Sequence, residues 1–564
     1  MSQHGMLLFV AACTVGGNAF KSTPPRLPLL RSKVSHRMTA SESLPLVEQF
    51  GKGLTRDIKL KTPFYKSDFT DAFNIKSLSS VIFLFFACLA PAVAFGGLLG
   101  LATKGQMGTM ETVGATAIGG VLYSLFSAQP LTIIGTTGPL LAFLKVLYET
   151  CSINNVPFLP VYSWVGLWCS FFLFISSLFS MSNVVEYFTR FTDDIFSSLI
   201  SVIFIVEAVK DLNGQFANPA VSGLQAFITL AVALATFLTA KVLSGLRRSP
   251  FLNRKVREVV SDFAPTIGVF TGVFAAAVAS KRYSSISLPM LSIPTLLSTT
   301  SGRPWLVDIF SVSSKIRLLC VFPAIMATVL LFMDQNITTR LIMSKENKLK
   351  KGSGLHLDMF VVAGVTAITS LLGMPWMVAA TVRSLAHLRS LKLYKITEVP
   401  GDSSEQKEST PPSEATTTAR VEMTGVQEQR LTGLLIHSLI GFSIINLRSV
   451  LRGIPNAVLT GLFLYLGVSS ITTTDLFDRF KLFFTDTRDI PSGFSWSKSI
   501  DVNRTKLFTA IQLFLLSAMW WMKGTKLGVF FPVLIGALAP ARIALEKFQI
   551  FSKEELNLLD GEIA

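Results

Sequence analysis

Two ionisable side chains inside strongly apolar stretches are the residues of this sequence best suited to chemistry. Asp334 lies in "TVLLFMDQNITTRLI" and Arg383 lies in "LGMPWMVAATVRSLAHL". A charge at the centre of a bilayer costs about 2.5–3.5 kcal/mol, so a chain seldom keeps one there without a use. Thr338 follows Asp334 by one helical turn and shares its face. Carboxylate and hydroxyl oxygens suit Na⁺ or a proton, whereas a guanidinium fork suits a planar oxyanion.

A simpler interpretation is that Asp334 and Arg383 only pair with each other between two helices. A structural role is favoured for a third group, Glu207, which precedes Lys210 by one turn in "VIFIVEAVKDL". That spacing predicts a local ion pair near a membrane edge. For Asp334 and Arg383, the mutual pair and the transport site both stay open on the residues alone.

The composition places these charges in a membrane protein. Half of the 564 residues are hydrophobic and only 15% are charged, with 45 Phe. This is too apolar for a soluble chain of that length. Apolar runs of about 18–25 residues recur, each long enough to cross a hydrocarbon core of about 30 Å. We therefore expect an all-α polytopic membrane protein that lies in a lipid bilayer.

The net charge of +16 and the five cysteines exclude other classes of protein. Lys and Arg gather in loops, as positive-inside bias requires, and no nucleic-acid-binding motif accompanies them. The cysteines show no CxxC spacing, and no HExxH, GxSxG or Walker motif occurs. We therefore expect neither an enzyme nor a nucleic-acid-binding protein, and no bound cofactor.

The chain from residue 77 onward contains fourteen apolar segments. If all of them cross the membrane, basic loops 242–261, 337–357 and 391–430 lie on the same side as the N-terminus, in agreement with the positive-inside rule. The last of these loops contains "GDSSEQKESTPPSEATTTAR" and is predicted to be disordered. The segments span approximately 77–102, 109–128, 131–149, 158–182, 193–212, 221–241, 262–280, 316–336, 358–374, 376–390, 431–447, 454–471, 505–523 and 526–545.

Residues 1–60 have the composition of a targeting presequence. Residues 1–41 contain no Asp or Glu, and the short apolar run "MLLFVAACTVGGNAF" precedes a basic stretch rich in Ser and Pro. A signal-type core followed by transit-type composition is similar to the two-part presequence of algae with complex plastids. It predicts a plastid-envelope membrane. A disordered cytosolic N-terminus and a plasma-membrane location are the alternatives.

Two segments are interrupted at matching positions. The third contains Pro130, Gly135, Gly138 and Pro139, and the tenth, seven segments later, begins after Pro375. Such interruptions at corresponding places in two halves indicate an inverted-repeat transporter. Their half-helices direct positive N-terminal ends at a central site, where backbone amides hold an anion. Two ordinary Pro-kinked helices are the alternative.

These features resemble the bicarbonate-transporter family of solute carriers, solute-carrier family 4, over residues from about 61 to 545. The motifs that carry the resemblance are "QPLTIIGTTGPLLAF", "LLFMDQNITTRLI", "KLKKGSGLHLD", "GMPWMVAATVRSLAHL", "VQEQRLTGLL" and "IPNAVLTGLFLYLGVSS", in this order. The family implies two inverted seven-segment repeats, 61–280 and 316–545, that form a core and a gate domain. An external loop at 281–315 joins them, a tail at 546–564 follows, and a homodimer is the usual assembly.

The resemblance also implies a substrate site between the third and tenth segments. Asp334 takes the place of the site carboxylate, which is aspartate in sodium-coupled members and glutamate in chloride/bicarbonate exchangers. Thr338 matches the sodium-coupled pattern as well, whereas Arg383 matches the exchangers. The half-helix residues that the family assigns to the anion are Thr136, Thr137, Gly138, Ala379, Ala380 and Thr381.

Together these features predict a secondary active transporter of bicarbonate or carbonate that works by alternating access. Arg383 and the two half-helices hold the anion, and Asp334 with Thr338 binds Na⁺ as the coupling ion. Electroneutral exchange with Cl⁻ is the alternative, and borate transport is a third. We also expect Asp334 to lie close enough to neutralise Arg383 when the site is empty.

Overall fold

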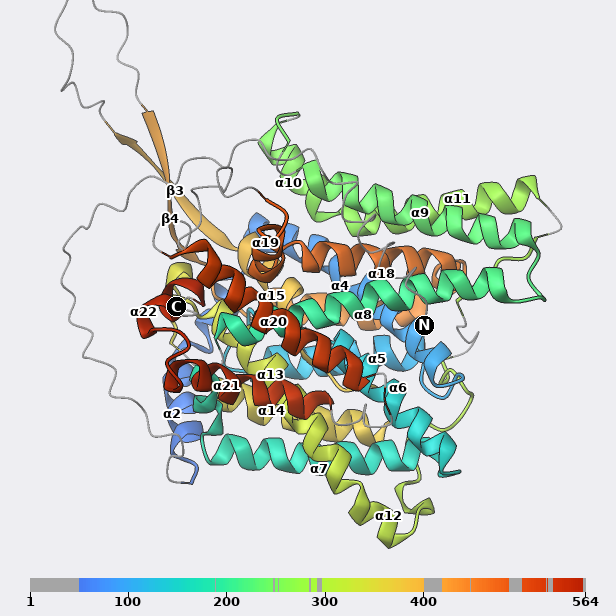
Figure 1. The fold of residues 1–564 in the computed structure, drawn as a ribbon, viewed down its shortest axis with the longest axis horizontal. Coiled ribbons are helices and arrows are strands. Elements are labelled where there is room, and N and C mark those ends of the chain that lie inside the picture. Colours follow the sequence, from blue (N-terminus) through green and yellow to red (C-terminus); the bar gives the residue numbers. More distant parts are fainter. Residues whose placement is uncertain are drawn as a thin grey trace, which may run out of the picture.

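The structure is a computed structural model. It describes residues 50–560 apart from 188, 247–248, 252, 284–285, 292–296, 353, 400–417, 447, 486–499, 524 and 526–530. The described part is built mainly from helices that run along one common direction (Figure 1). The longer ones are α4 (Ile75–Ala102), α5 (Thr109–Phe126), α6 (Gly138–Ile153), α7 (Phe158–Leu178), α8 (Arg190–Ala217), α9 (Gly223–Gly245), α11 (Ala264–Arg282), α13 (Val321–Ile342), α14 (Leu355–Leu371), α15 (Thr381–Ser390), α16 (Leu431–Asn446), α18 (Asn456–Ile471), α20 (Val502–Lys523) and α21 (Phe531–Lys547).

A helix lies within every apolar segment that the sequence predicts, so the mostly helical architecture is confirmed. Among the described residues, α4, α7, α9, α11 and the run Ser314–Ile342 are long and apolar enough to cross a membrane. The run joins α12 (Ser314–Leu319) to α13. A sixth candidate is α18 with α19 (Asp475–Lys481), a pair bent by 74°. Fourteen crossings in two inverted repeats remain a prediction.

The third and tenth segments are not continuous helices. Each has an extended stretch followed by a shorter helix: β1 (Ile134–Gly135) precedes α6, and β2 (Val378–Ala379) precedes α15. The two stretches pair as antiparallel strands, with Ile134 opposite Ala379 and Gly135 opposite Val378. The Pro- and Gly-rich breaks therefore meet in the interior, as the sequence pattern predicts for half-helices.

A helix that precedes the first apolar segment is anchored to the second half of the chain. This helix, α2 (Lys52–Lys61), buries the Asp57 carboxylate, which accepts the backbone N–H groups of His356 at 2.9 Å and Leu357 at 3.2 Å. Burial raises the pKa of Asp57 to about 6. The predicted disorder of residues 1–60 is therefore wrong for α2. Residues 1–49 lie outside the described part, and the presequence-like character of 1–60 stays a prediction.

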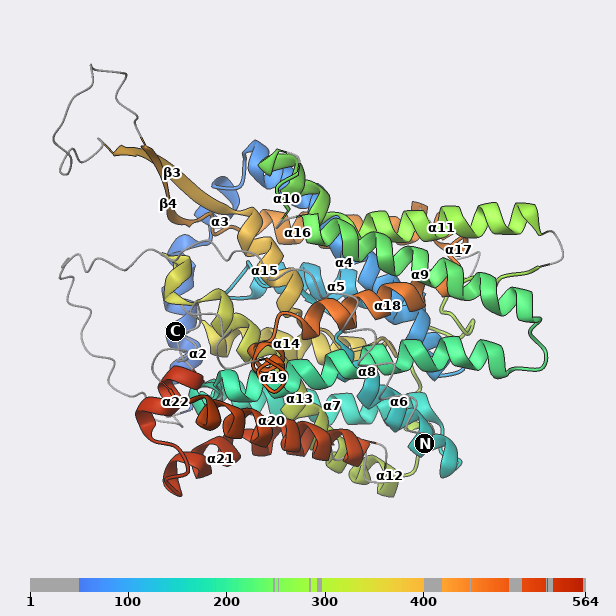
Figure 2. The same cartoon turned by 45° about the horizontal axis from the view of Figure 1, so that its top comes forward.

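A β-hairpin projects from the same end of the molecule as α2 and α10 (Arg254–Asp262) (Figures 1 and 2). Its strands β3 (Lys392–Val399) and β4 (Thr418–Val426) pair antiparallel. The prediction of disorder over 391–430 is wrong for these strands, because "KLYKITEV" and "TARVEMTGV" contain enough β-branched and aromatic residues to form a ladder. Residues 400–417 lie outside the described part.

The predicted tail at 546–564 contains a short helix, α22 (Lys553–Leu559), which is docked on the helices before it. Asp560 accepts the backbone N–H of Phe191 at the start of α8 at 2.5 Å and the Nε–H of Arg542 at 2.9 Å. Arg504 of α20 donates two hydrogen bonds of 2.9 Å to the carboxylate of Glu555. The tail therefore ties together α8, α20 and α21.

Candidate functional site

The candidate site lies where α6 and α15 begin. Thr137 precedes α6 with an extended backbone, and Ala380 does the same before α15. The backbone N–H of Ala380 donates to Ile133 O at 2.9 Å, which extends the pairing of β1 and β2 by one bond. The N-terminal ends of both half-helices, with their unsatisfied amides and positive dipole ends, are thereby held next to one crossing.

Arg383 is buried beside this crossing, with 8% of the residue exposed. Its Nη2 donates to the carbonyl of Thr136 at 2.7 Å. Its Nη1 is buried and has no hydrogen-bond partner among the described residues. Gly135 makes this approach possible, because a Cβ there would lie 2.5 Å from Nη1. One arm of the guanidinium fork is thus anchored and the other is unpartnered.

Asp334 contacts the residue that follows Thr136. Its Oδ2 accepts the hydroxyl of Thr137 at 2.8 Å, and the carboxylate is buried within α13. Although both residues are described, Asp334 and Arg383 form no ion pair within 4 Å. Mutual pairing as their only role is therefore wrong. They instead bind two consecutive residues of the first break. The expectation that Asp334 lies close enough to neutralise Arg383 when the site is empty stays a prediction.

The hydroxyls of Thr338 and Thr381 join α13 to the start of α15. Their Oγ1 atoms lie 2.7 Å apart, and either can donate. Gly138 begins α6 and packs so tightly that an added Cβ would lie 2.5 Å from the ring of Phe204. The Oγ1 of Thr136 is buried without a partner within the described part of the chain. All of the predicted site residues therefore lie at the crossing or on the elements that adjoin it.

Two residues beside the predicted ones hold the crossing together and were missed at the level of sequence. The side-chain oxygen of Gln335 accepts the backbone N–H of Ala379 at 3.0 Å, and its Nε2 donates to Tyr123 Oη at 2.9 Å. The hydroxyl of Ser384 accepts the N–H of Ile133 at 2.9 Å. The sequence contained one sign of both: Gln335 and Ser384 are polar residues that directly follow Asp334 and Arg383 in apolar segments.

Two other features lie away from this site. Glu207 forms an ion pair of 3.2 Å with Lys145 of α6, both partly exposed, whereas the sequence favoured Lys210 as its partner.

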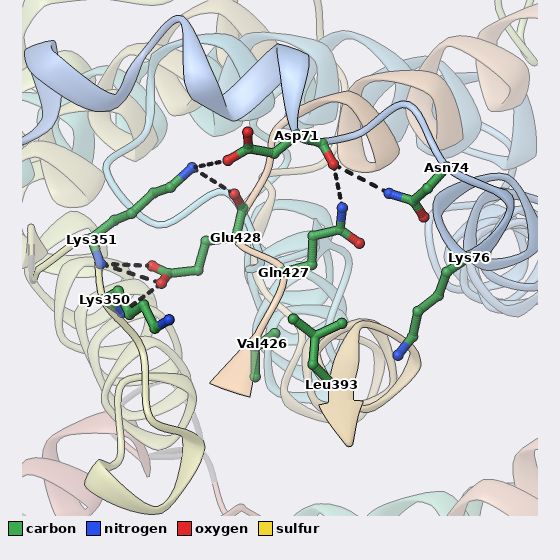
Figure 3. Close-up of a pocket in the computed structure, with 9 residues that line it drawn as sticks. All are labelled: Asp71, Asn74, Lys76, Lys350, Lys351, Leu393, Val426, Gln427 and Glu428. Carbon is green, nitrogen blue, oxygen red and sulfur yellow. Dashed lines mark hydrogen bonds and ion pairs between the residues drawn. The ribbon is translucent and has the colours of Figure 1, made fainter. Parts of the chain in front are cut away.

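A pocket of about 490 Å³ near the hairpin (Figure 3) contains none of the predicted site residues. Within the described residues, no group of three or more His, Cys, Asp and Glu is arranged to hold a metal ion. The pocket is lined by Asp71, Asn74, Lys76, Lys350, Lys351, Leu393, Val426, Gln427 and Glu428.

The sequence matches one protein family over nearly its whole length. That family is described as the HCO3⁻ transporter integral membrane domain, and the match covers residues 48–225 and 220–564.

Curated relatives match over most of this chain. Electroneutral sodium bicarbonate exchanger 1 of Rattus norvegicus is 33% identical over 593 residues, which are 92% of this chain and 52% of that protein. Band 3 anion transport protein of Rattus norvegicus is 35% identical over 537 residues, 91% of this chain and 55% of that protein. Electrogenic sodium bicarbonate cotransporter 1 of Sus scrofa is 33% identical over 599 residues, 93% and 53% of the two chains. The chain spans about half the length of these relatives.

Solved structures share the fold at low sequence identity. The transmembrane domain of the cyanobacterial bicarbonate transporter BicA superposes with a TM-score of 0.54 at 14% identity, over 81% of this chain and 97% of that one. Murine Solute Carrier 26 family member A9, in its inward-facing state, superposes with a TM-score of 0.57 at 12% identity, over 93% and 77% of the two chains. At these identities the similarity concerns the fold alone.

Proposed function

The chain belongs to the HCO3⁻ transporter integral membrane domain family, and from this premise we propose that it is a secondary active transporter of bicarbonate or carbonate. The family consists of membrane transporters rather than enzymes. Transport proceeds by alternating access, in which a core that carries the two half-helices moves against a gate. The names of the relatives, which include sodium bicarbonate and anion transport proteins, support this class of substrate.

The observation that carries the proposal is the unpartnered Nη1 of buried Arg383. Leaving a buried charged donor unpaired is costly, so a ligand that accepts its hydrogen bond gains correspondingly. A planar oxyanion fits one arm of the guanidinium. The hydroxyl of Thr136, also unpartnered, and the amides at the starts of α6 and α15 supply further donors.

We propose that Na⁺ is the coupled ion and that Asp334 binds it with the hydroxyl oxygens of Thr137 and Thr338. These hard oxygen ligands lie on neighbouring elements, joined by the bond from Thr137 to Asp334 and the one between Thr338 and Thr381. A unit charge on Arg383 at 4 Å would repel Na⁺ by about 4 kcal/mol at an effective dielectric of 20. This repulsion falls as the distance from the guanidinium grows, and Asp334 forms no ion pair with Arg383 within 4 Å.

Chloride/bicarbonate exchange is the second candidate. It is favoured by Arg383 itself, the residue that matches the exchangers, because a fixed positive charge lets the site hold one monovalent anion without a cation. Borate transport is a third candidate, less favoured because the segment after Pro375 follows the bicarbonate pattern.

The test of anion binding compares variants of Arg383 in proteoliposomes. Arg383→Ala is expected to weaken anion affinity, and Arg383→Lys to restore only part of it, because an ammonium keeps the charge and loses the fork. Thermal unfolding of each variant is measured alongside, because Arg383 also holds the carbonyl of Thr136. If Arg383→Ala keeps wild-type anion affinity, the proposed role in binding is wrong.

We further propose a homodimer in a plastid-envelope membrane. The location follows from the acid-free composition of residues 1–41. A fluorescent protein fused to residues 1–60 is expected to reach the plastid in the source organism. Signal at the cell surface would instead assign the plasma membrane, and diffuse cytosolic signal would remove the targeting proposal.

A further inference from the structure

Each of the two breaks starts beside a charged group from a distant part of the chain. At the first break, the Oδ1 of Asp358 accepts the backbone N–H groups of Ala128 at 2.6 Å and Gln129 at 3.1 Å, just after α5 ends. Asp358 is fully buried in the first turn of α14. A carboxylate therefore fixes where the chain leaves helical geometry on the side of α2 and the hairpin.

At the second break the anchoring group is an arginine. Arg303 comes from the loop between α11 and α12, and its Nη2 donates to the carbonyls of Gly373 at 2.8 Å and Leu372 at 3.2 Å, just after α14 ends. Leu372 is the C-cap of α14, and its carbonyl is among those that a helix C-terminus leaves without intrahelical partners. Gly373 has φ +59°, and a Cβ there would collide with the guanidinium. Both the left-handed turn and the approach of Arg303 therefore require glycine at position 373.

The loop that carries Arg303 is itself fixed to the start of α5. The buried carboxylate of Glu111 accepts the backbone N–H of Thr300 at 2.7 Å and its hydroxyl at 2.5 Å. The carbonyl of Arg303 accepts the hydroxyl of Thr299 at 2.7 Å. Beyond Arg303, the backbone N–H of Val307 donates to Leu371 at 2.9 Å. The loop thus connects the start of α5 with the end of α14, and Arg303 cannot move freely.

We propose that Arg303 is a positioning residue for the anion site, acting through the extended stretch between Gly373 and Thr381. That stretch is held at one end by Arg303 and at the other by pairing with β1. It leads directly into α15, which carries Thr381 and Arg383. If the bonds from Arg303 are lost, the turn at Gly373 relaxes and the start of α15 is no longer held in place opposite α6. Displacements of about 1 Å are enough to weaken a positioned site severely.

The inference rests on the proposed transport function. Its test combines a transport assay with hydrogen exchange, which does not depend on that function. The variants are Arg303→Gln and Arg303→Lys. The matched control is Arg317→Gln. Arg317 lies in α12, directly after the same loop, and within the described residues its guanidinium donates to the nearby carbonyls of Val312 and Phe310 and packs over the rings of Trp164 and Phe310, without a bond to the stretch 372–384. Hydrogen exchange of residues 374–384 is measured in the purified protein by mass spectrometry, and bicarbonate uptake is measured in proteoliposomes over a range of concentrations.

Arg303→Gln is expected to speed exchange across residues 374–384 and to raise the KM for bicarbonate about tenfold, with kcat changed less than twofold. Arg303→Lys is expected to give an exchange rate and a KM between those of the wild type and Arg303→Gln, because an ammonium replaces part of the fork. It also provides the test if Arg303→Gln fails to fold. The control keeps wild-type exchange and KM. Unchanged exchange in both Arg303 variants overturns the inference whatever the transport result. Faster exchange with a wild-type KM also overturns it. No uptake by the wild type would instead contradict the proposed function.

Discussion

Gly135→Ala is the substitution that tests the anion site without removing any polar group. The added Cβ would lie 2.5 Å from Nη1, 2.7 Å from Nη2 and 2.8 Å from Cζ of Arg383. Non-bonded heavy atoms prefer about 3.5–4.0 Å, so the guanidinium must withdraw by about 1 Å. The Nη2 bond to Thr136, now 2.7 Å, would then exceed hydrogen-bond length. Gly135 is not in the left-handed region, so alanine fits the backbone there.

The size of the expected loss of anion affinity in Gly135→Ala follows from the displacement of the guanidinium charge. A hydrogen bond to a charged group contributes about 1.5–3 kcal/mol, and each 1.4 kcal/mol is a factor of about ten in affinity. Because the guanidinium is displaced rather than removed, we expect the lower part of that range, an anion affinity about tenfold weaker. Removal of the guanidinium by Arg383→Ala should weaken anion affinity by about ten- to a hundredfold.

The assay is uptake of labelled bicarbonate by proteoliposomes over a range of concentrations, with thermal unfolding of each variant measured alongside. Gly364→Ala is the matched control, because an added Cβ on Gly364 in α14 has no atom within 4 Å. It should keep wild-type affinity. A wild-type KM for Gly135→Ala would refute the placement of the anion against Arg383, since the guanidinium would have moved without consequence.

Three further predictions concern the coupling ion and the tail. Asp334→Asn is expected to abolish Na⁺-stimulated flux while the protein still folds, because an amide cannot balance the Na⁺ charge; persistence of Na⁺ stimulation in flux assays would contradict the assignment. Thr338→Val should weaken apparent Na⁺ affinity and Thr338→Ser should retain it, so an equal effect of both would indicate packing instead. The hydrogen bonds from Arg504 lower the pKa of Glu555 to about 2, below its ordinary 4.5. The stability that this pair contributes is therefore fully present above about pH 4.5 and is lost as the pH falls toward 2. Glu555→Gln should lower the melting temperature at pH 7, by a difference that shrinks on acidification; a difference independent of pH would exclude the ion pair as its cause.

The helices and the two breaks were predictable because their causes are local in sequence. Apolar runs of membrane length predict helices wherever they occur, and Pro375 and Gly138 mark where a helix must stop or start. The meeting of the breaks also followed from their matching positions in two halves. A pattern of this kind defines which residues share an element. Asp334, Thr338 and Arg383 became candidates on that basis, whereas the half-helix residues were assigned by the resemblance to the family.

The partners of the buried charges were not predictable, because they depend on distances across the fold. Helical spacing puts Asp334 and Thr338 on one face, but it does not say that the carboxylate binds Thr137 instead of Arg383. The arginine that fixes Gly373 comes from a loop about 70 residues earlier in the chain, for which the sequence offered no periodic signal. The hairpin was missed because the polar composition around it outweighed its two short strands.

Uptake of labelled inorganic carbon into proteoliposomes of the purified protein tests the central claim most directly. It is measured with and without an inward Na⁺ gradient, and with and without chloride inside the vesicles. We predict bicarbonate uptake that the Na⁺ gradient drives and that does not need internal chloride. Uptake that requires internal chloride and ignores Na⁺ would assign the exchanger mechanism, and no uptake under any of these conditions would contradict the proposed function.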